Sequence, residues 1–467
     1  MPDSDAPIHS PMRSFFAGLS LLLLGATLGA GGLWFKLGPN SPEAHRRDAL
    51  LQMRTAENDR LRALVAEQEH NQAAEKNKAA RTEIEHQVAE IRGLSFKKPV
   101  DYAVVNRPQI KQVLARKLAE TFSEQEFAQI SAAFSRLGLL PENYPLRQKF
   151  IDLLGEQVAA FYDQHSHKLF MFEDATLENA QNRVVLAHEL THALQDQHFN
   201  LSNLPLEIKD NDDRAMAASA LVEGEATLVM SDYMMHNLSL QALKDNISMS
   251  LTQNMDQLRQ APRYLRETLV FPYLRGQEFC SALLEQGGYA AISKAYARLP
   301  ESSAQILHPE SYLANPPVTA QALVWPAEAL AAAKPAVQNV LGEFGLRLLL
   351  EEAVAGAKSD LSTSDAEHIA SGWRGDHYLY FNQGDILLWK TAWSTESAAN
   401  RFLEAERGFL LKRYKPAAPH DSDGALGMDA PRFVRLYRAT DNTVWLIDAA
   451  DAEAAQRVQK LFSPERP

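Results

Sequence analysis

The segment that most constrains this chain is Leu186 to Leu194, with the sequence Leu-Ala-His-Glu-Leu-Thr-His-Ala-Leu. Its composition predicts a helix, on which His188 and His192 lie one turn apart on the same face. Two imidazoles placed in this way can bind one metal ion, most often zinc. Glu189 projects from a neighbouring face, where its carboxylate can act as the general base on a zinc-bound water.

A catalytic zinc needs a third protein ligand and an open position for water. One candidate is His198, which follows His188 by ten residues. A histidine at that spacing reaches the metal only if a glycine turns the chain out of the helix, and Gln195 stands at that position. If the helix continues, His198 lies more than two turns along it and points elsewhere.

The second candidate is Glu223, which lies in an otherwise apolar helix face. A carboxylate there is costly unless a metal or another cation pairs with it, so we expect Glu223 to be the third ligand. Gly224 leaves room for another helix to approach closely. Glu225 points away, and we expect it to support the site from behind or to be solvated. Asp196, Asp232 and His198 are candidates to hold the imidazoles.

These segments resemble the zincin metallopeptidases, and within them the thermolysin-like gluzincins, over residues 145–235. Val185 to Asp196 is similar to the thermolysin active-site helix, and Glu223-Gly-Glu-Ala226 is similar to the segment that carries the zinc glutamate in gluzincin aminopeptidases. The resemblance implies a zincin-like fold, zinc ligands His188, His192 and Glu223, and Glu189 as the base. Thr227 departs from the pattern, which has an acidic residue at this position.

Residues 96–318 would form this catalytic domain, mainly helical with a small sheet. We expect helices over 109–121, 124–137 and 146–155, then strands over 158–163 and 168–173. By the resemblance, this hairpin would line the cleft and pair with extended substrate. The metal helix would cover 177–197 and the Glu223 helix 214–235. His308 is our candidate for stabilising the oxyanion, and a capping role in a loop is the alternative.

Residues 1–36 contain a run of 22 residues without charge, Ser14 to Phe35. That length is sufficient to span a bilayer and favours a single-pass membrane anchor over a cleaved signal peptide. The positive residues after the run would place the rest of the chain in the cytoplasm. An N-terminal apolar segment is, however, the usual export signal, so we expect an extracytoplasmic catalytic domain.

Residues 37–95 are polar and predict a long helical stalk. Ile84, Val88 and Ile91 have heptad spacing, which predicts a short coiled coil and a homodimer, while a solvated single helix is the alternative. Residues 319–467 predict a small C-terminal α+β domain, in which two strands and a helix are followed by two further strands and a helix. The overall fold class is therefore α+β.

The composition excludes some classes of partner and some kinds of site. The net charge of -12 leaves no basic surplus for phosphates, so we expect no nucleic-acid partner. Cys280 is the only cysteine, which excludes an intrachain disulfide and a zinc site built from cysteines. The sequence predicts a membrane-anchored zinc endopeptidase that acts on protein or peptide substrates. The alternative is a non-catalytic scaffold that zinc stabilises and that binds partners in the cell envelope.

Overall fold

The structure is a computed structural model of the chain. It describes residues 42–462, except for positions 107–108, 110–111, 113–114, 117, 120–121, 158–159, 173–174, 240–255, 352–360, 423–424 and 440. The predicted membrane segment, Ser14 to Phe35, lies outside the described residues. None of the helices that the described residues form combines the length and the apolar composition needed to cross a membrane.

Contacts divide the chain into two units, residues 1–76 and residues 77–467. The predicted stalk forms one helix, α2 (Pro42–Arg92), which Gly93 ends with a left-handed backbone at φ 69°. In the first unit, the described side chains of Met53 and Leu61 are exposed. The last four turns of α2 belong to the second unit.

The heptad positions at the end of α2 do not form a seam for a partner helix. Ile84 and Val88 are fully buried, and Ile91 packs against the same cluster of this chain. That cluster includes Leu186, Leu190 and Val229 from the two helices that carry the predicted metal ligands. The prediction of a coiled coil over these three positions was therefore wrong, because the chain's own core covers them. The homodimer stays a prediction.

Two short helices precede the hairpin that the sequence predicted. Helix α4 (Glu124–Leu137) begins with the expected capping box between Ser123 and Glu126, and α5 (Leu146–Gln157) follows it. Three strands then form a sheet in the order β1-β3-β2, in which β1 runs parallel to β3 and β2 antiparallel to it. Their bounds are Asp101–Val105 for β1, Ala160–Asp163 for β2 and Lys168–Phe172 for β3. Strand β2 is thus an edge strand.

Helices α6 (Ala180–Phe199) and α7 (Asp212–Asn237) carry the predicted metal ligands. Asn179 caps the start of α6 with its side chain, and Asn200 ends the helix in a left-handed conformation. Two 3-10 turns, η1 (Leu201–Asn203) and η2 (Pro205–Glu207), lead to the start of α7. Both helices agree with the predicted ranges to within three residues.

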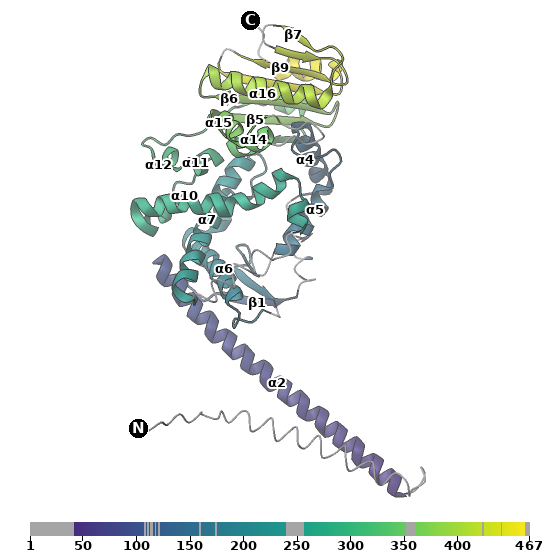
Figure 1. The fold of residues 1–467 in the computed structure, drawn as a ribbon, viewed down its shortest axis with the longest axis vertical. Coiled ribbons are helices and arrows are strands. Elements are labelled where there is room, and N and C mark those ends of the chain that lie inside the picture. Colours follow the sequence, from purple (N-terminus) through teal and green to yellow (C-terminus); the bar gives the residue numbers. More distant parts are fainter. Residues whose placement is uncertain are drawn as a thin grey trace, which may run out of the picture. The chain divides into compact units, whose positions relative to one another are not determined.

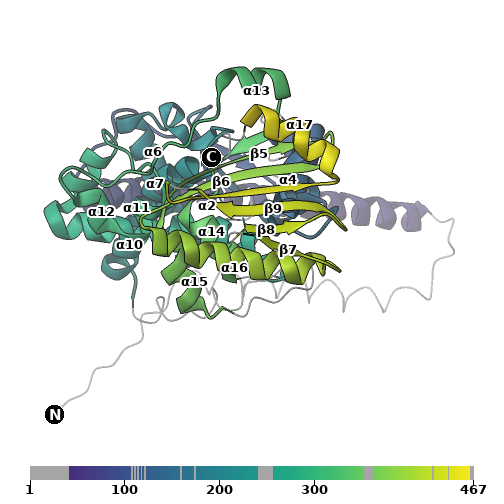
Figure 2. The same ribbon diagram turned by 90° about the horizontal axis from the view of Figure 1, so that it is seen from above.

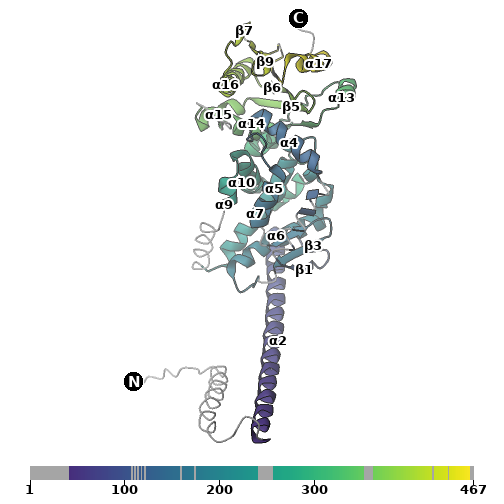
Figure 3. The same cartoon turned by 90° about the vertical axis from the view of Figure 1, so that its right-hand side faces the viewer.

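Helix α10 (Arg263–Ala295) packs along α7, as Figures 1 and 3 show. The two backbones touch where Gly224 of α7 meets Gly276 of α10. A Cβ atom at Gly224 would lie 2.1 Å from the carbonyl carbon of Gly276, and one at Gly276 would lie 2.2 Å from the carbonyl oxygen of Ala220. The close approach expected at Gly224 is confirmed, and only glycine permits it on either helix.

The chain then forms a seven-stranded antiparallel sheet in the order β4-β5-β6-β10-β9-β8-β7. The sequence predicted β5, β6, β9 and β10 and missed the two edge strands, β4 and β7, and the neighbouring strand β8. The strands are β4 (Val337–Asn339), β5 (Trp373–Phe381), β6 (Ile386–Trp393), β7 (His420–Ser422), β8 (Ala425–Met428), β9 (Phe433–Arg438) and β10 (Thr443–Ala449). The helices of this region and before it are α9 (Asp256–Gln260), α11 (Ser303–Leu307), α12 (Pro309–Leu313), α13 (Ala327–Ala333), α14 (Gly342–Glu351), α15 (Thr363–Ala370), α16 (Glu396–Tyr414) and α17 (Ala452–Phe462).

Helices cover both faces of this sheet, with α13 and α17 on one face and α14, α15 and α16 on the other (Figure 2). The second face shares one apolar core with α4, α7 and α10, since Phe134, Leu221, Phe279 and Trp389 belong to the same cluster. The described parts of residues 96–318 and 319–467 are therefore joined by a common core. The division into two domains, residues 96–318 and 319–467, stays a prediction.

The glycine contact gives a stability prediction. We expect Gly276→Ala to lower the free energy of unfolding by about 1–3 kcal/mol or more, because the new methyl group meets the backbone of α7 and the helices must separate. Urea unfolding measures the change. Gly408→Ala in α16 is the matched control, since its Cβ would have no neighbour within 4 Å. It should be neutral or should stabilise by up to about 1 kcal/mol. Equal effects at the two positions would contradict the prediction.

Candidate metal centre

The structure brings His188, His192 and Glu223 together at the contact between α6 and α7. The Nε2 atoms of the two imidazoles are 3.1 Å apart. The Oε2 atom of Glu223 lies 3.2 Å from Nε2 of His188 and 3.3 Å from Nε2 of His192. Among the residues that the structure describes, these three are the group of His, Cys, Asp and Glu side chains that could hold a metal ion.

The distances suit a tetrahedral zinc. Zinc binds imidazole nitrogen at about 2.0–2.1 Å, so tetrahedral ligand atoms are about 3.3 Å apart. The three atoms of the cluster form a triangle of this size. Two imidazoles that turn their Nε2 atoms toward each other and toward a carboxylate can share one cation, either a proton or a metal ion. The donor set and its spacing therefore fit a metal ion.

The tautomer of His192 follows from its contact with Gln195. The amide nitrogen of Gln195 has two acceptors, the carbonyl oxygen of Val222 at 2.9 Å and Oε2 of Glu225 at 2.7 Å. The amide oxygen must then face Nδ1 of His192, which lies 2.8 Å away and donates its hydrogen. This leaves the lone pair of His192 on Nε2, where a metal ligand needs it.

Gln195 is a functional residue that the sequence did not indicate as such. Asp196 and Asp232, which the sequence indicated as residues that could hold the imidazoles, bond to other groups. Asp196 accepts hydrogen bonds from the Tyr162 hydroxyl and from His167, while Asp232 accepts one from Tyr289. These two carboxylates therefore hold other elements in place.

His198 is not part of the cluster, as the geometry of a continuous helix predicted. Helix α6 runs through it to Phe199, and its Nε2 atom lies 2.9 Å from the carbonyl oxygen of Ser95. Glu225 also lies outside the cluster. It is fully buried rather than solvated, and its partners are Arg92, Gln195 and Tyr296.

Glu189 lies between the two histidines in the sequence and turns toward the edge strand β2. Its Oε2 atom accepts the backbone N–H of Tyr162 at 2.7 Å. Burial raises the pKa of Glu189, and the neighbouring His188 and His192 oppose this rise. A carboxylate whose pKa is raised above its ordinary value is a better proton acceptor for general-base work at neutral pH.

The charges of the cluster depend on each other when no metal is bound. Burial alone would lower the pKa of His192, but the charge of Glu223, its hydrogen bond and the charge of Glu189 together outweigh burial and raise this pKa to about 9. Burial would raise the pKa of Glu223, but the charge of His192 and the hydrogen bond from His188 hold it well below its usual range. A metal cation at the centre would replace the proton that the cluster shares.

Tyr273 of α10 stands beside the cluster, and the sequence did not single it out. Its ring stacks on that of His188 with centroids 6.0 Å apart. The charge of Glu223 raises its pKa well above the ordinary value, so the hydroxyl keeps its hydrogen. Because 41% of the side chain is exposed, Tyr273 can also reach a bound ligand.

His308 is not brought to the cluster, which corrects its predicted catalytic role. Its Nε2 atom lies 2.7 Å from Oε1 of Glu343 in α14. This region contacts the start of α7, where the backbone N–H of Ser303 bonds to Asp213. Asp213 precedes Glu223 by ten residues, or about 15 Å along the helix, so His308 and Glu343 lie near the start of α7 and away from the cluster.

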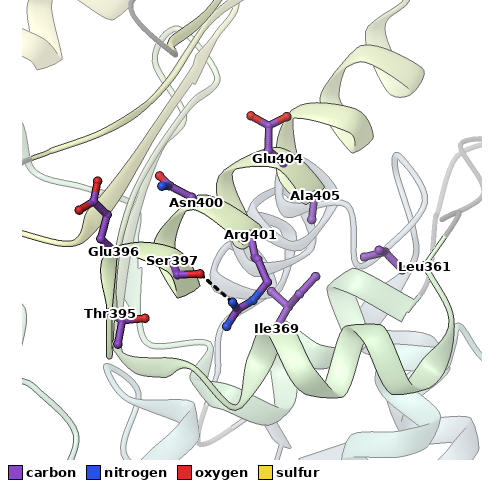
Figure 4. Close-up of a pocket in the computed structure, with 9 residues that line it drawn as sticks. All are labelled: Leu361, Ile369, Thr395, Glu396, Ser397, Asn400, Arg401, Glu404 and Ala405. Carbon is purple, nitrogen blue, oxygen red and sulfur yellow. Dashed lines mark hydrogen bonds between the residues drawn. The ribbon is translucent and has the colours of Figure 1, made fainter.

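A groove of about 880 Å³ lies between α15 and α16 (Figure 4). Its polar lining includes Glu396, Arg401 and Glu404, and no histidine or cysteine occurs among the lining residues that the structure describes. It lies in the C-terminal part of the chain. The groove therefore offers fewer ligands for a metal ion than the cluster on α6 and α7 does.

Comparison with known proteins adds little to this geometry. A family model described as "Domain of unknown function (DUF8575)" matches residues 331–459. No curated protein matches the chain. The chain is similar to a solved structure, the "putative hydrolase with a novel fold from Chloroflexus aurantiacus", with 18% identity and a TM-score of 0.32. The match covers 51% of this chain and 88% of that chain. A TM-score of this size does not establish a shared fold.

The charge balance gives a prediction about metal binding. Zinc must displace the proton of His192, so we expect the apparent zinc affinity to rise with pH up to about pH 9 and then to level off. About one proton should be released per zinc at neutral pH. Calorimetric titration in buffers with different ionisation enthalpies counts these protons. Glu223→Gln removes the charge that raises the pKa of His192, and this variant should release fewer protons. A wild-type chain that binds zinc without releasing a proton would contradict the prediction.

Proposed function

We propose that the chain is a zinc-dependent endopeptidase of the thermolysin-like gluzincin type. The observation that supports it best is the triangle of His188, His192 and Glu223 with Glu189 beside it. Three protein ligands leave one position open, which is the arrangement of catalytic rather than structural zinc sites. The bound zinc would act as a Lewis acid toward water and the peptide carbonyl.

The other steps belong to side chains of the chain itself. Glu189 takes a proton from the attacking water as the oxygen–carbon bond forms, and gives it to the peptide nitrogen as the carbon–nitrogen bond breaks. Tyr273 keeps its hydroxyl hydrogen and can donate it to the carbonyl oxygen as negative charge develops there. In this proposal Tyr273 takes the role that the sequence gave to His308.

The substrate would lie along the edge strand β2. Strand β2 is an outer strand of the small sheet, and an extended peptide could add beside it as a further strand. The backbone N–H of Tyr162 on this strand already faces Glu189, so a peptide there would pass the proposed base. The membrane anchor over Ser14 to Phe35 and an extracytoplasmic site remain part of the proposal and rest on the sequence.

The substitution Glu189→Gln tests the role of Glu189 as the general base. We expect this variant to bind zinc as the wild type does and to lose peptide hydrolysis by about 10²–10⁴-fold, since the amide cannot accept the proton. Zinc content and cleavage of a peptide library measure the two effects. Hydrolysis that survives the substitution would refute the mechanism. A wild-type chain that holds zinc but cleaves no peptide would favour the non-catalytic scaffold instead.

Tyr273→Phe and His308→Gln separate the two candidates for oxyanion stabilisation. We expect Tyr273→Phe to lower kcat by about 10²–10³-fold with little change in zinc affinity, because it removes a hydrogen bond that forms in the transition state. His308→Gln should leave kcat within about twofold, since His308 contacts Glu343 rather than the cluster. The reverse pattern would return the role to His308.

A further inference from the structure

A buried ion pair joins the end of α2 to α7. Arg92 is 3% exposed and Glu225 is 0% exposed, and the guanidinium Nε donates to Oε1 of the carboxylate. Arg92 also donates to the hydroxyl of Ser293 at 2.9 Å and lies over the ring of Tyr289. Two charges taken out of water in this way are costly unless the pairing is close and their other hydrogen-bonding positions are filled.

The second oxygen of Glu225 is also occupied. Its Oε2 atom accepts the hydroxyl of Tyr296 at 2.5 Å and the amide nitrogen of Gln195 at 2.7 Å. The carboxylate and the carbonyl oxygen of Val222 therefore fix together which end of the Gln195 amide faces them. The opposite end, the amide oxygen, accepts the Nδ1–H of His192.

Three contacts thus connect Arg92 with His192, although these residues are 100 positions apart in the sequence and lie on different helices. Arg92 orients Glu225, Glu225 orients Gln195, and Gln195 holds His192 in the tautomer that presents Nε2 to the other two ligands. If the amide of Gln195 turned over, its nitrogen would face Nδ1, and the hydrogen of His192 would have to move to Nε2.

We propose that Arg92 is a positioning residue of the metal site, and that the last turns of the predicted stalk helix are part of that site. The proposal rests on metal binding by His188, His192 and Glu223, which is one part of the proposed function, and does not require peptidase activity. It follows that a chain beginning after residue 92 would lack one support of the zinc ligand His192.

The experiment measures the zinc dissociation constant of the full chain by competition with a chelator, together with the Tm of the metal-free protein. We expect Arg92→Met to raise the dissociation constant by about 10–100-fold, the usual effect of removing a residue that orients a metal ligand. Arg183→Met is the matched control. Arg183 also ties α2 to α6, through Glu83 at 3.1 Å, but it has no contact with Gln195 among the described hydrogen bonds. The zinc dissociation constant of Arg183→Met should stay within about threefold of the wild-type value.

The double variant Arg92→Met/Glu225→Met separates positioning from stability. Replacing both members of a buried pair by apolar side chains is often neutral for folding, so its Tm should recover relative to Arg92→Met. The zinc dissociation constant should stay raised, because the amide nitrogen of Gln195 has lost one of its two acceptors and keeps only the carbonyl oxygen of Val222. Recovery of zinc affinity together with Tm would show a purely structural role and overturn the proposal.

The remaining outcomes are equally decisive. Unchanged zinc affinity in Arg92→Met would overturn the proposal while leaving the proposed function intact. A wild-type chain that binds zinc but hydrolyses no peptide would remove the peptidase and leave the role of Arg92 supported by the affinity data. Absence of zinc binding in the wild type would overturn both.

Discussion

The contact between the backbones of α7 and α10 is the constraint on which the site depends. Gly224 and Gly276 remove the side chains that would otherwise hold the helices apart. Because Glu223 adjoins the first glycine and Tyr273 precedes the second by one turn, the contact places the tyrosine beside the carboxylate. The same helix α7 packs on α6, so that Glu223 also meets the two histidines. One close approach therefore positions groups from three helices.

Helix α7 also joins the site to the rest of the second unit. At its start, the backbone N–H of Asp212 bonds to Asn339 of β4, and Asp213 accepts the N–H of Ser303. In its middle, Glu225 is fully buried and Glu223 is partly buried, and each has cationic or polar partners. Buried carboxylates must be compensated in this way, because each unpaired charge would cost several kcal/mol. The pairing with Arg92 also explains why the end of α2 packs inside the second unit.

Much of the fold was predictable from local patterns. The ranges of α4, α6 and α7, the hairpin β2–β3 and the central strands of the large sheet follow from capping residues and hydrophobic periodicity, which depend on neighbours in the sequence. The short strands β4, β7 and β8 were missed, because three or four residues carry too little periodicity. The heptad spacing of Ile84, Val88 and Ile91 was misinterpreted, since a buried helix face and a coiled-coil seam look alike in a sequence.

The sequence by itself determined that His188, His192 and Glu189 share one turn of helix, because i, i+4 spacing fixes that geometry whatever surrounds it. It also indicated Glu223, since an isolated carboxylate in an apolar face needs a partner. Only the tertiary structure decided the rest. Gln195, Tyr273 and Arg92 act through contacts with residues 3 to 133 positions away, and no local pattern states which helices will meet. The tertiary structure also separates His308 from the site, because the chain folds that histidine against Glu343 instead.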